Sequence, residues 1–450
     1  MPLFLRYLDD KYDKLSLAQN KMAQWIKPLL TMDGEQRFEV MMLADQYGNM
    51  ISGANPTGMA VDAFGRARVS QPVTLFDSTN RYQDDSRIIT TNSVSGATVT
   101  HDANASLTNC TLDTTSGAYI YRETARVFSY QPGKSLQILQ TFVMATPKEN
   151  LRQRYGYFST ENGVFLQVDG TEISFIIRSK SSGSVVEEKV TQSNWNLDTL
   201  DGTGISGKTL DITKAQILFI DIEWLGVGSV RMGFVIDGKF IHCHSFHHAN
   251  LIAQTYMTTA SLPARCEIQN TGTTSSSSTL KAICTTVISE GGYELRGRPK
   301  SASTPITSPY TLTTAGTFYP VVSIRLKSTR LDGIAIPKDI RLLGTSNVGN
   351  YQYQIFVGAT ITGGTWVSVD NSSVEYNISG TALSGGIGIE SGYTTVSNQS
   401  APVISLDNNQ FKYQLERNSF TSTPTTFTLG VTGGQNGNTC VGGIEWEDIL

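Results

Sequence analysis

Residues 215–246 constrain the fold more than any other stretch of the chain. Their first part, Gln216–Trp224, alternates strictly between two faces, which is the period of a β-strand with one buried face. The two faces carry, respectively, Ile220, Ile222 and Trp224, and Phe219, Asp221 and Glu223. The sequence therefore predicts a strand that buries its aliphatic face in a core.

Two turns divide the remainder of this stretch. Residues 225–228 (LGVG) follow the first strand, and Asp237-Gly238 is a strong hairpin signal because both turn residues need positive φ. Ser229–Ile236 and Lys239–Phe246 are then the second and third strands. Three consecutive antiparallel strands with one apolar face predict the centre of a β-sandwich.

The composition agrees with an all-β chain and excludes several classes of protein. Charged residues make up 16% of the 450 residues, and 41 glycines accompany many Ser, Thr and Asn residues, which suits short strands joined by tight turns rather than helices. A net charge of −4 argues against nucleic-acid binding. There is no apolar run of about 18 residues for a membrane span. The N-terminus is too charged for a signal peptide, and five scattered cysteines indicate free thiols made in a cytoplasm.

The length suggests two domains with extensions. Candidate strands after residue 82 are Asn92–His101, Ala118–Phe128, Leu136–Ala145, Gln153–Ser159, Val164–Val168, Ile173–Arg178, Ala264–Asn270 and Thr279–Ser289. Many strands at this spacing favour a jelly roll. We expect an N-terminal amphipathic or coiled-coil helix (1–35), a β-hairpin and extended arm (36–85), a lectin-like jelly-roll sandwich (86–295), a Gly-, Ser- and Pro-rich linker (296–309) and a smaller C-terminal β-sandwich (310–450).

Residues 3–27 carry the one long helical pattern, which Pro28 ends. Apolar residues recur at heptad spacing, with polar Gln19 at one position that can set register. The predicted seam is Leu5, Leu8, Tyr12, Leu15, Gln19, Met22 and Ile26. Such a seam predicts self-association, with a trimer as the first expectation; the alternative is an amphipathic helix that lies on its own domain.

The first predicted core strand carries two carboxylates at a spacing that can serve catalysis. Phe219-Ile220-Asp221-Ile222-Glu223 resembles the Glu-x-Asp-x-Glu strand of retaining endoglucanases of lectin-like fold, which places its carboxylates on one face about 5 Å apart. Phe219 occupies the nucleophile position, so no covalent step is available. We expect Asp221 and Glu223 to lie on a solvated outer face, and we predict no catalytic residue.

Two stretches contain side chains of the kinds that bind metal ions. His242 and His244 should point the same way on a strand, as two ligands would, and His247 and His248 follow them, but no third ligand is evident. Residues 198–204 (DTLDGTG) have the composition of a calcium loop without the spacing of an EF-hand. We expect a polar strand end and an ordinary loop, without metal or cofactor. Tryptophans that could stack on sugars, but are expected in cores, are Trp195, Trp224, Trp366 and Trp446.

Several long strings resemble a family of virion proteins of tailed phages, notably cyanophages and other marine phages. These strings are Asp62–Ser78, Tyr130–Ser135, Arg152–Phe158 and Asp221–Phe234, and the resemblance covers about residues 60–295. It implies a structural component of a virion, assembled in the host cytoplasm, and it supplies no catalytic residues.

Three functions follow as expectations. The first is an exposed appendage, either a tail-associated fibre or adhesin or a head decoration. It would be a homotrimer, attached to other virion proteins through residues 1–80 and contacting glycans of the host surface. The second is a purely architectural capsid, neck or tail protein that binds only virion partners. The third is a polysaccharide-degrading appendage that uses Asp221 and Glu223.

Overall fold

The computed structural model describes residues 71–84, 88–294, 296–346, 349–395, 403–405 and 413–449. These residues belong to one compact unit, residues 70–450. The predicted N-terminal helix with its seam, and residues 36–70 of the predicted arm, lie outside the described residues. Within the described part, no helix is long and apolar enough to cross a membrane.

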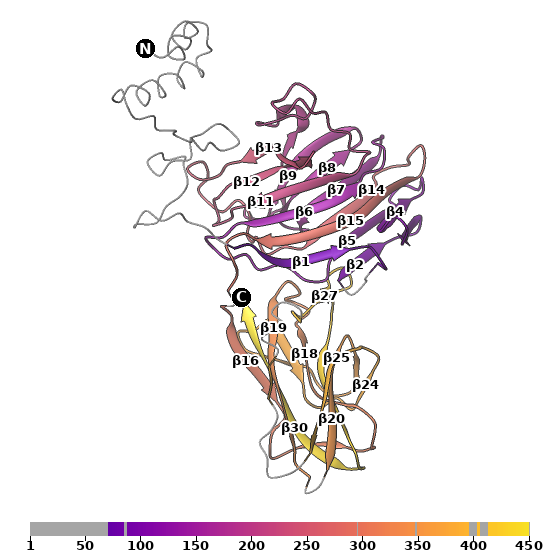
Figure 1. Cartoon of the computed structure of the whole chain (residues 1–450), viewed down its shortest axis with the longest axis vertical. Helices are drawn as coiled ribbons and strands as arrows, with labels where there is room; N and C mark the ends of the chain where they lie inside the picture. The colour runs from indigo at the N-terminus through magenta and orange to yellow at the C-terminus, as the bar shows by residue number, and fades with distance from the viewer. Residues whose placement is uncertain are drawn as a thin grey trace, which may run out of the picture. The chain divides into compact units, whose positions relative to one another are not determined.

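The first sandwich is a jelly roll of two antiparallel sheets (Figure 1). In the described residues, its eight-stranded sheet has the order β13 (Lys239–Phe246), β12 (Val230–Ile236), β11 (Gln216–Ile222), β6 (Leu136–Val143), β15 (Ser278–Ser289), β4 (Leu107–Leu112) and β3 (Ala97–Asp102), with β1 (Val73–Thr79) paired to β15. The seven-stranded sheet has the order β10 (Val186–Thr191), β9 (Glu172–Ser179), β8 (Gly163–Asp169), β7 (Leu151–Phe158), β14 (Ala264–Asn270), β5 (Tyr119–Thr124) and β2 (Ile89–Ser93).

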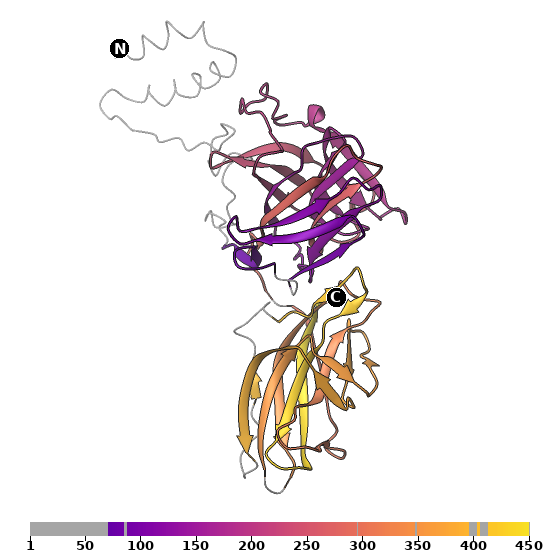
Figure 2. The ribbon, with the colours of Figure 1, turned by 90° about the vertical axis from the view of Figure 1, so that its right-hand side faces the viewer.

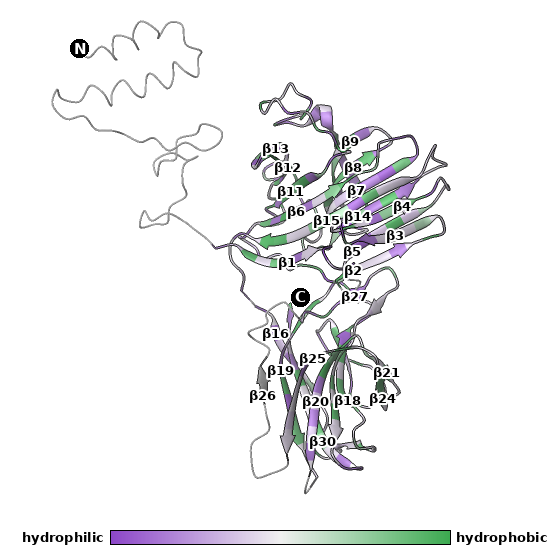
Figure 3. Cartoon of the chain, turned by 45° about the vertical axis from the view of Figure 1, so that its right-hand side comes forward, coloured by the Kyte–Doolittle hydropathy of each residue, from purple (hydrophilic) through white to green (hydrophobic). Residues whose placement is uncertain are grey.

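The core of the jelly roll lies between these two sheets because their strands alternate. Ile138 and Ile220 of one sheet and Leu166 and Ile268 of the other are fully buried in one hydrophobic cluster. Figure 3 shows hydrophobic segments recurring along the strands. The predicted aliphatic face of β11 is confirmed, since Ile220 and Ile222 lie in this core.

The three strands of residues 215–246 form as predicted, but they are not the centre of the sheet. β13 is the edge strand, and β6 and β15 lie nearer the middle. Position within a sheet depends on which distant strands pair, and β6 pairs with both β11 and β15. Local alternation cannot reveal that pairing.

The second sandwich is built mainly from residues 298–449, coloured orange to yellow in Figure 2. One sheet contains β16 (Arg298–Ser303), β30 (Asn438–Ile449), β19 (Ile334–Gly344) and β26 (Val403–Ser405), with β17 (Tyr310–Leu312) paired to β30. The other contains β22 (Val367–Ser368), β23 (Val374–Asn377), β18 (Tyr319–Leu326), β29 (Phe427–Gly433), β20 (Asn350–Val357) and β25 (Ile387–Thr395). Two small ribbons pair β21 (Thr360–Thr362) with β24 (Ala382–Ser384) and β27 (Arg417–Asn418) with β28 (Thr423–Pro424).

The all-β fold class is therefore confirmed, and two expected segments differ in detail. Val73–Thr79, expected in an extended arm, is a strand that pairs with β15 and buries Leu75 and Phe76 in the core. Arg298–Ser303, expected in a linker, pairs along its whole length with β30. Pro299 is tolerated there because β16 is an edge strand of its sheet. Backbone pairing with a distant strand decided both segments, and composition does not show it.

Candidate functional site

The outer face of β11 is not solvated as expected. Phe219 is fully buried there because its ring packs edge-on against Phe240, at a centroid distance of 5.1 Å, and against His242 at 4.8 Å. Gly233 of β12 leaves room for this ring, since a Cβ at that position would lie 2.8 Å from it. The sheet buries this ring with its own side chains, so alternation alone gave the wrong exposure.

Asp221 is also buried, with 7% of its surface exposed. It accepts a hydrogen bond from Gln137 Nε2 at 3.4 Å and pairs with Arg231 at 3.3 Å. Burial raises the pKa of its carboxyl group to about 6, against the opposing charge of Arg231. Glu223 lies beyond the end of β11, is exposed, and accepts the backbone N–H of Ser229 at 3.4 Å. The two carboxylates therefore have different roles: Asp221 pairs with a neighbouring strand, and Glu223 holds the turn that follows β11.

The two strand histidines point to opposite faces, which corrects the expectation that they point the same way. Met232 pairs with His244 and Gly233 pairs with His242, so Cys243 is the extra residue of a β-bulge. His242 therefore packs on Phe219 outside the sheet, whereas His244 packs on core residue Phe246 at 4.4 Å. Burial, followed by the charge of nearby His247, lowers the pKa of His244 to about 4.

The loop at residues 198–204 uses its acids for its own backbone. The buried carboxylate of Asp198 accepts the N–H groups of Leu200 at 2.9 Å and Ser206 at 2.7 Å, and Asp201 accepts the N–H of Thr203 at 2.8 Å. Across the described residues, no group of three or more His, Cys, Asp or Glu side chains could hold a metal ion.

The four tryptophans considered for sugar stacking differ in their surroundings. Trp195, Trp224 and Trp446 pack in or against the hydrophobic cores, as expected. Trp366 belongs to neither core; it is half-buried, and the Arg325 guanidinium lies 3.9 Å from the centre of its ring.

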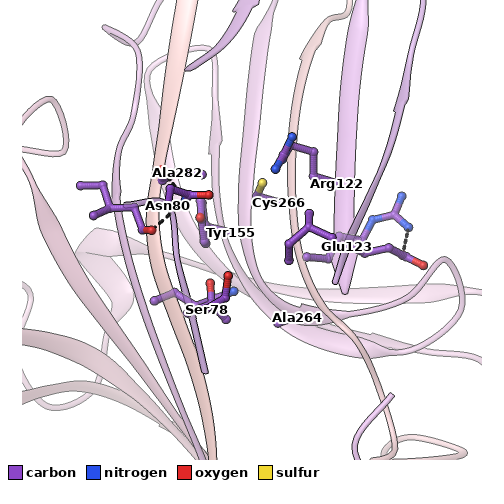
Figure 4. A pocket seen from close by; sticks show the side chains of 13 residues that line it. Ser78, Asn80, Arg122, Glu123, Tyr155, Ala264, Cys266 and Ala282 are labelled. Atoms are coloured by element: carbon purple, nitrogen blue, oxygen red, sulfur yellow. Dashed lines mark hydrogen bonds and ion pairs between the residues drawn. The ribbon is translucent and has the colours of Figure 1, made fainter. Parts of the chain in front are cut away.

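A cavity inside the jelly roll is too small for a ligand. It measures about 30 Å³, and Figure 4 shows Ser78, Asn80, Tyr155 and Cys266 around it. That volume holds about one water molecule. Gln140 also lines the cavity, and its Oε1 atom has no hydrogen-bond partner among the described residues. One water molecule in the cavity would donate a hydrogen bond to this atom.

A larger groove opens at one end of the jelly roll, between the β9–β10 hairpin and the loop at residues 248–256. We call it the end groove. Its volume is about 530 Å³, within the range of small-molecule sites. It is lined by Ile177, Ser179, Ser181, Ser182, Val186, Glu188, His248, Ile252, Ala253, Gln254, Thr255 and Tyr256.

The two walls of the end groove come from distant parts of the chain. Ile177 pairs with Glu188 and Ser179 with Val186, so one wall is the inward face of the hairpin. The opposite wall is a loop held by local hydrogen bonds, including those from Tyr256 N–H to Gly226 O at 2.9 Å and from Leu251 N–H to His248 O at 2.9 Å. Gln254 Nε2 joins the walls by donating to Ser181 Oγ at 3.4 Å.

Two exposed apolar side chains, Val186 and Ile252, line the end groove. Together with their exposed chain neighbours Val185 and Leu251 we call them the apolar rim. Val185 and Val186 are 47% and 54% exposed on the hairpin side, and Leu251 and Ile252 are 72% and 38% exposed on the loop side. Isolated exposed apolar residues are ordinary, but exposed apolar residues on both walls of a groove indicate a contact surface.

Sequence reasoning did not predict the end groove. It placed His248 in a possible metal cluster, but nothing in the sequence shows that His248 faces the β9–β10 hairpin. Positive φ at Asn250 (64°) and Gly183 (88°) shapes the two loops. Asn and Gly at these positions indicate tight turns in the sequence, but they do not indicate a binding site.

Comparison with known proteins gives distant structural likenesses. No model of a protein family matches the chain, and no curated protein matches it. A protein of unknown function from Shewanella oneidensis aligns with 50% of this chain and 90% of its own, at 12% identity and a TM-score of 0.33. A legume lectin-like domain from Entamoeba histolytica aligns with 48% of this chain and 97% of its own, at 8% identity and a TM-score of 0.31.

A third likeness is to a carbohydrate esterase from the Shiga toxin-encoding bacteriophage phi24B. It covers 49% of this chain and 99% of that chain, at 12% identity and a TM-score of 0.28. The jelly roll is defined by strand pairing, independently of these likenesses. The functional interpretation rests on the side chains of this chain.

Proposed function

We propose that this protein is an exposed appendage of a tailed-phage particle and that it binds carbohydrate through the end groove. The observation that carries the proposal is the groove itself, whose volume suits one or two sugar rings. Its walls combine aliphatic side chains with hydroxyl, amide and carboxylate groups, the pairing that a sugar needs for its C–H faces and its hydroxyl groups.

The phage assignment rests on the sequence resemblance over residues 60–295. Three of its four strings contribute strands to the jelly roll scaffold: Asp62–Ser78 reaches into β1, Arg152–Phe158 lies in β7, and Asp221–Phe234 runs from β11 into β12. None of the four strings contains a residue that lines the end groove. The scaffold would then be common to the resembling virion proteins, and the end groove would be particular to this chain. Such a division suits a protein that attaches to the particle by one surface and binds its target by another.

The alternative is an architectural protein that binds only other virion proteins. The apolar rim favours it, because exposed aliphatic side chains are typical of surfaces that dock protein partners. In that case the rim would be covered in the particle, and the groove would hold a partner's side chain.

Two measurements on the full-length chain separate these functions. Antibodies against the chain should label intact purified particles, and the chain should bind a subset of glycans on an array. Particle labelling without glycan binding would favour the architectural protein. Absence of the chain from purified particles would contradict the phage assignment.

A further inference from the structure

We propose that the end groove takes a neutral pyranose and that His248 accepts a hydrogen bond from one of its hydroxyl groups. This inference rests on the proposed function and deepens it, because it names the class of sugar and the residue that contacts it.

The tautomer of the neutral His248 ring follows from its partner. Its Nδ1 atom lies 2.6 Å from the carbonyl oxygen of Gly228, and a carbonyl can only accept, so Nδ1 carries the hydrogen. Nε2 of the neutral ring is then an acceptor. Among the described residues, none donates a hydrogen bond to it. His248 is 5% exposed and lines the groove, so a ligand hydroxyl group in the groove can satisfy this acceptor.

The ring of His248 is held in place before any ligand arrives. It stacks on Tyr256 with ring centres 4.0 Å apart and planes 5° apart. Tyr256 is in turn fixed by its backbone bond to Gly226, and its buried hydroxyl group has no partner among the described residues. A pre-positioned acceptor loses little conformational entropy on binding, which favours affinity.

The charges around the end groove select against acidic sugars. No Lys or Arg is among its lining residues, and the carboxylate of Glu188 is the one formal charge among them. An acidic sugar would bring a second negative charge beside Glu188 with no cation to offset it. A neutral sugar avoids that repulsion, and Glu188 can accept from its hydroxyl groups.

The remaining contacts match a pyranose ring. Val186 and Ile252 give the groove aliphatic surface for the C–H face of the sugar. The hydroxyl groups of Ser179 and Ser181 lie 2.9 Å apart, and Gln254 continues this polar line into the opposite wall. The serine hydroxyl groups can each donate or accept a hydrogen bond, so they can bind a sugar hydroxyl in either its axial or its equatorial orientation. Binding measurements with several neutral sugars identify the preferred epimer.

The test is titration calorimetry of the full-length chain with methyl glycosides of glucose, galactose, mannose and N-acetylglucosamine, and with glucuronic and galacturonic acids. We expect at least one neutral glycoside to bind and the acids to bind at least tenfold more weakly. His248→Asn keeps an N–H for Gly228 O but removes the Nε2 acceptor, and should weaken neutral binding at least tenfold.

His247→Asn is the matched control, because the same change is made one residue away at an exposed ring that contacts Ser229 and does not line the groove. It should leave binding within twofold. A second variant, Glu188→Gln, removes the one negative charge of the lining and should bring the affinity of the acids closer to that of the neutral sugars.

The outcomes distinguish the two proposals. Equal binding of acidic and neutral sugars, or neutral binding that His248→Asn leaves unchanged in a folded variant, would overturn this inference while glycan binding itself stands. Failure of the wild-type chain to bind any glycan on an array would overturn the proposed function as well.

Discussion

At the scale of single residues, burial gives Asp221 an unusual influence on stability. Its carboxyl group lies on the outer face of β11, yet it is almost entirely covered. Arg231, its ion-pair partner, has a side chain that is 51% exposed, so solvent screens much of the attraction. Desolvation outweighs that attraction, and the pKa rises from 3.8 to about 6.

Asp221→Asn should therefore stabilise the protein at high pH. Between pH 3.8 and about 6 the folded state binds more protons than the unfolded state, so stability falls as pH rises through this window. The amide carries no charge, and the variant should be more stable by on the order of 2 kcal/mol above pH 7. Urea denaturation at pH 4 and pH 8 measures this difference.

Glu223→Gln is the control, because it makes the same chemical change at an exposed neighbour. Its stability relative to wild type should change little between the two pH values. A wild type more stable than Asp221→Asn at pH 8 would show that the ion pair with Arg231 dominates, contrary to the prediction.

At the scale of secondary-structure elements, β12 and β13 meet in a way that requires glycine. Gly233 lies opposite the bulge at Cys243, where β13 approaches closely: an added Cβ would lie 2.0 Å from the carbonyl oxygen of Ile241. The buried ring of Phe219 covers the same spot. The bulge and this glycine together decide that His242 and His244 face opposite ways.

Gly233→Ala should destabilise the protein by roughly 1–3 kcal/mol, since backbone and a packed ring must both move. Gly238→Ala is the comparison. Its φ of 72° makes alanine strained, but open space surrounds the position, so the cost should be about 1 kcal/mol. Thermal unfolding of both variants measures the difference, and an equal cost would mean that the strand contact relaxes freely.

At the scale of the whole molecule, one segment of the second sandwich's chain bonds to the jelly roll. Arg417, 2% exposed, donates its backbone N–H to Ala125 O at 2.8 Å, and its guanidinium group lies 3.0 Å from Glu123 and from Asp332. Gln414 Nε2 donates to Val127 O at 2.8 Å. Buried polar contacts of this kind couple residues 413–420 to the end of β5.

Arg417→Met should cost about 1–3 kcal/mol, because it leaves the buried carbonyl oxygen of Thr124 without its guanidinium donor. Glu123 keeps its pair with Arg265 at 2.8 Å, and Asp332 is 58% exposed. Arg296→Met is its control, since the Arg296–Glu294 pair is exposed and should contribute little to stability. Differential scanning calorimetry measures both. If the two sandwiches are coupled, Arg417→Met should unfold in a single thermal transition at a lower temperature than wild type. An unchanged unfolding temperature in Arg417→Met would contradict the coupling.

The oligomer also belongs to this scale, and its prediction rests on the heptad seam between Leu5 and Ile26. Full-length chain should have three times the monomer mass of 49.0 kDa in light scattering, and a chain lacking residues 1–35 should be a monomer. An unchanged mass after the deletion would show that the seam is not the interface.

The sequence by itself determined the features that depend on neighbours along the chain. Alternation in β11, the turn at residues 225–228 and the Asp237-Gly238 turn were sufficient for an all-β sandwich with Ile220 and Ile222 in its core. One predicted strand over residues 92–101 is instead β2 and β3, in different sheets, with Gly96 at a φ of 88° between them.

Tertiary structure alone decided the features that depend on distant segments. Phe219 and Asp221 are buried because strands β12 and β13 supply a glycine, aromatic rings and a bulge beside them. The end groove exists because a hairpin at residues 179–186 faces a loop about 70 residues later in the chain. Such contacts arise only when sheets pair and pack, so no local pattern encodes them, and the residues proposed to bind sugar lie among them.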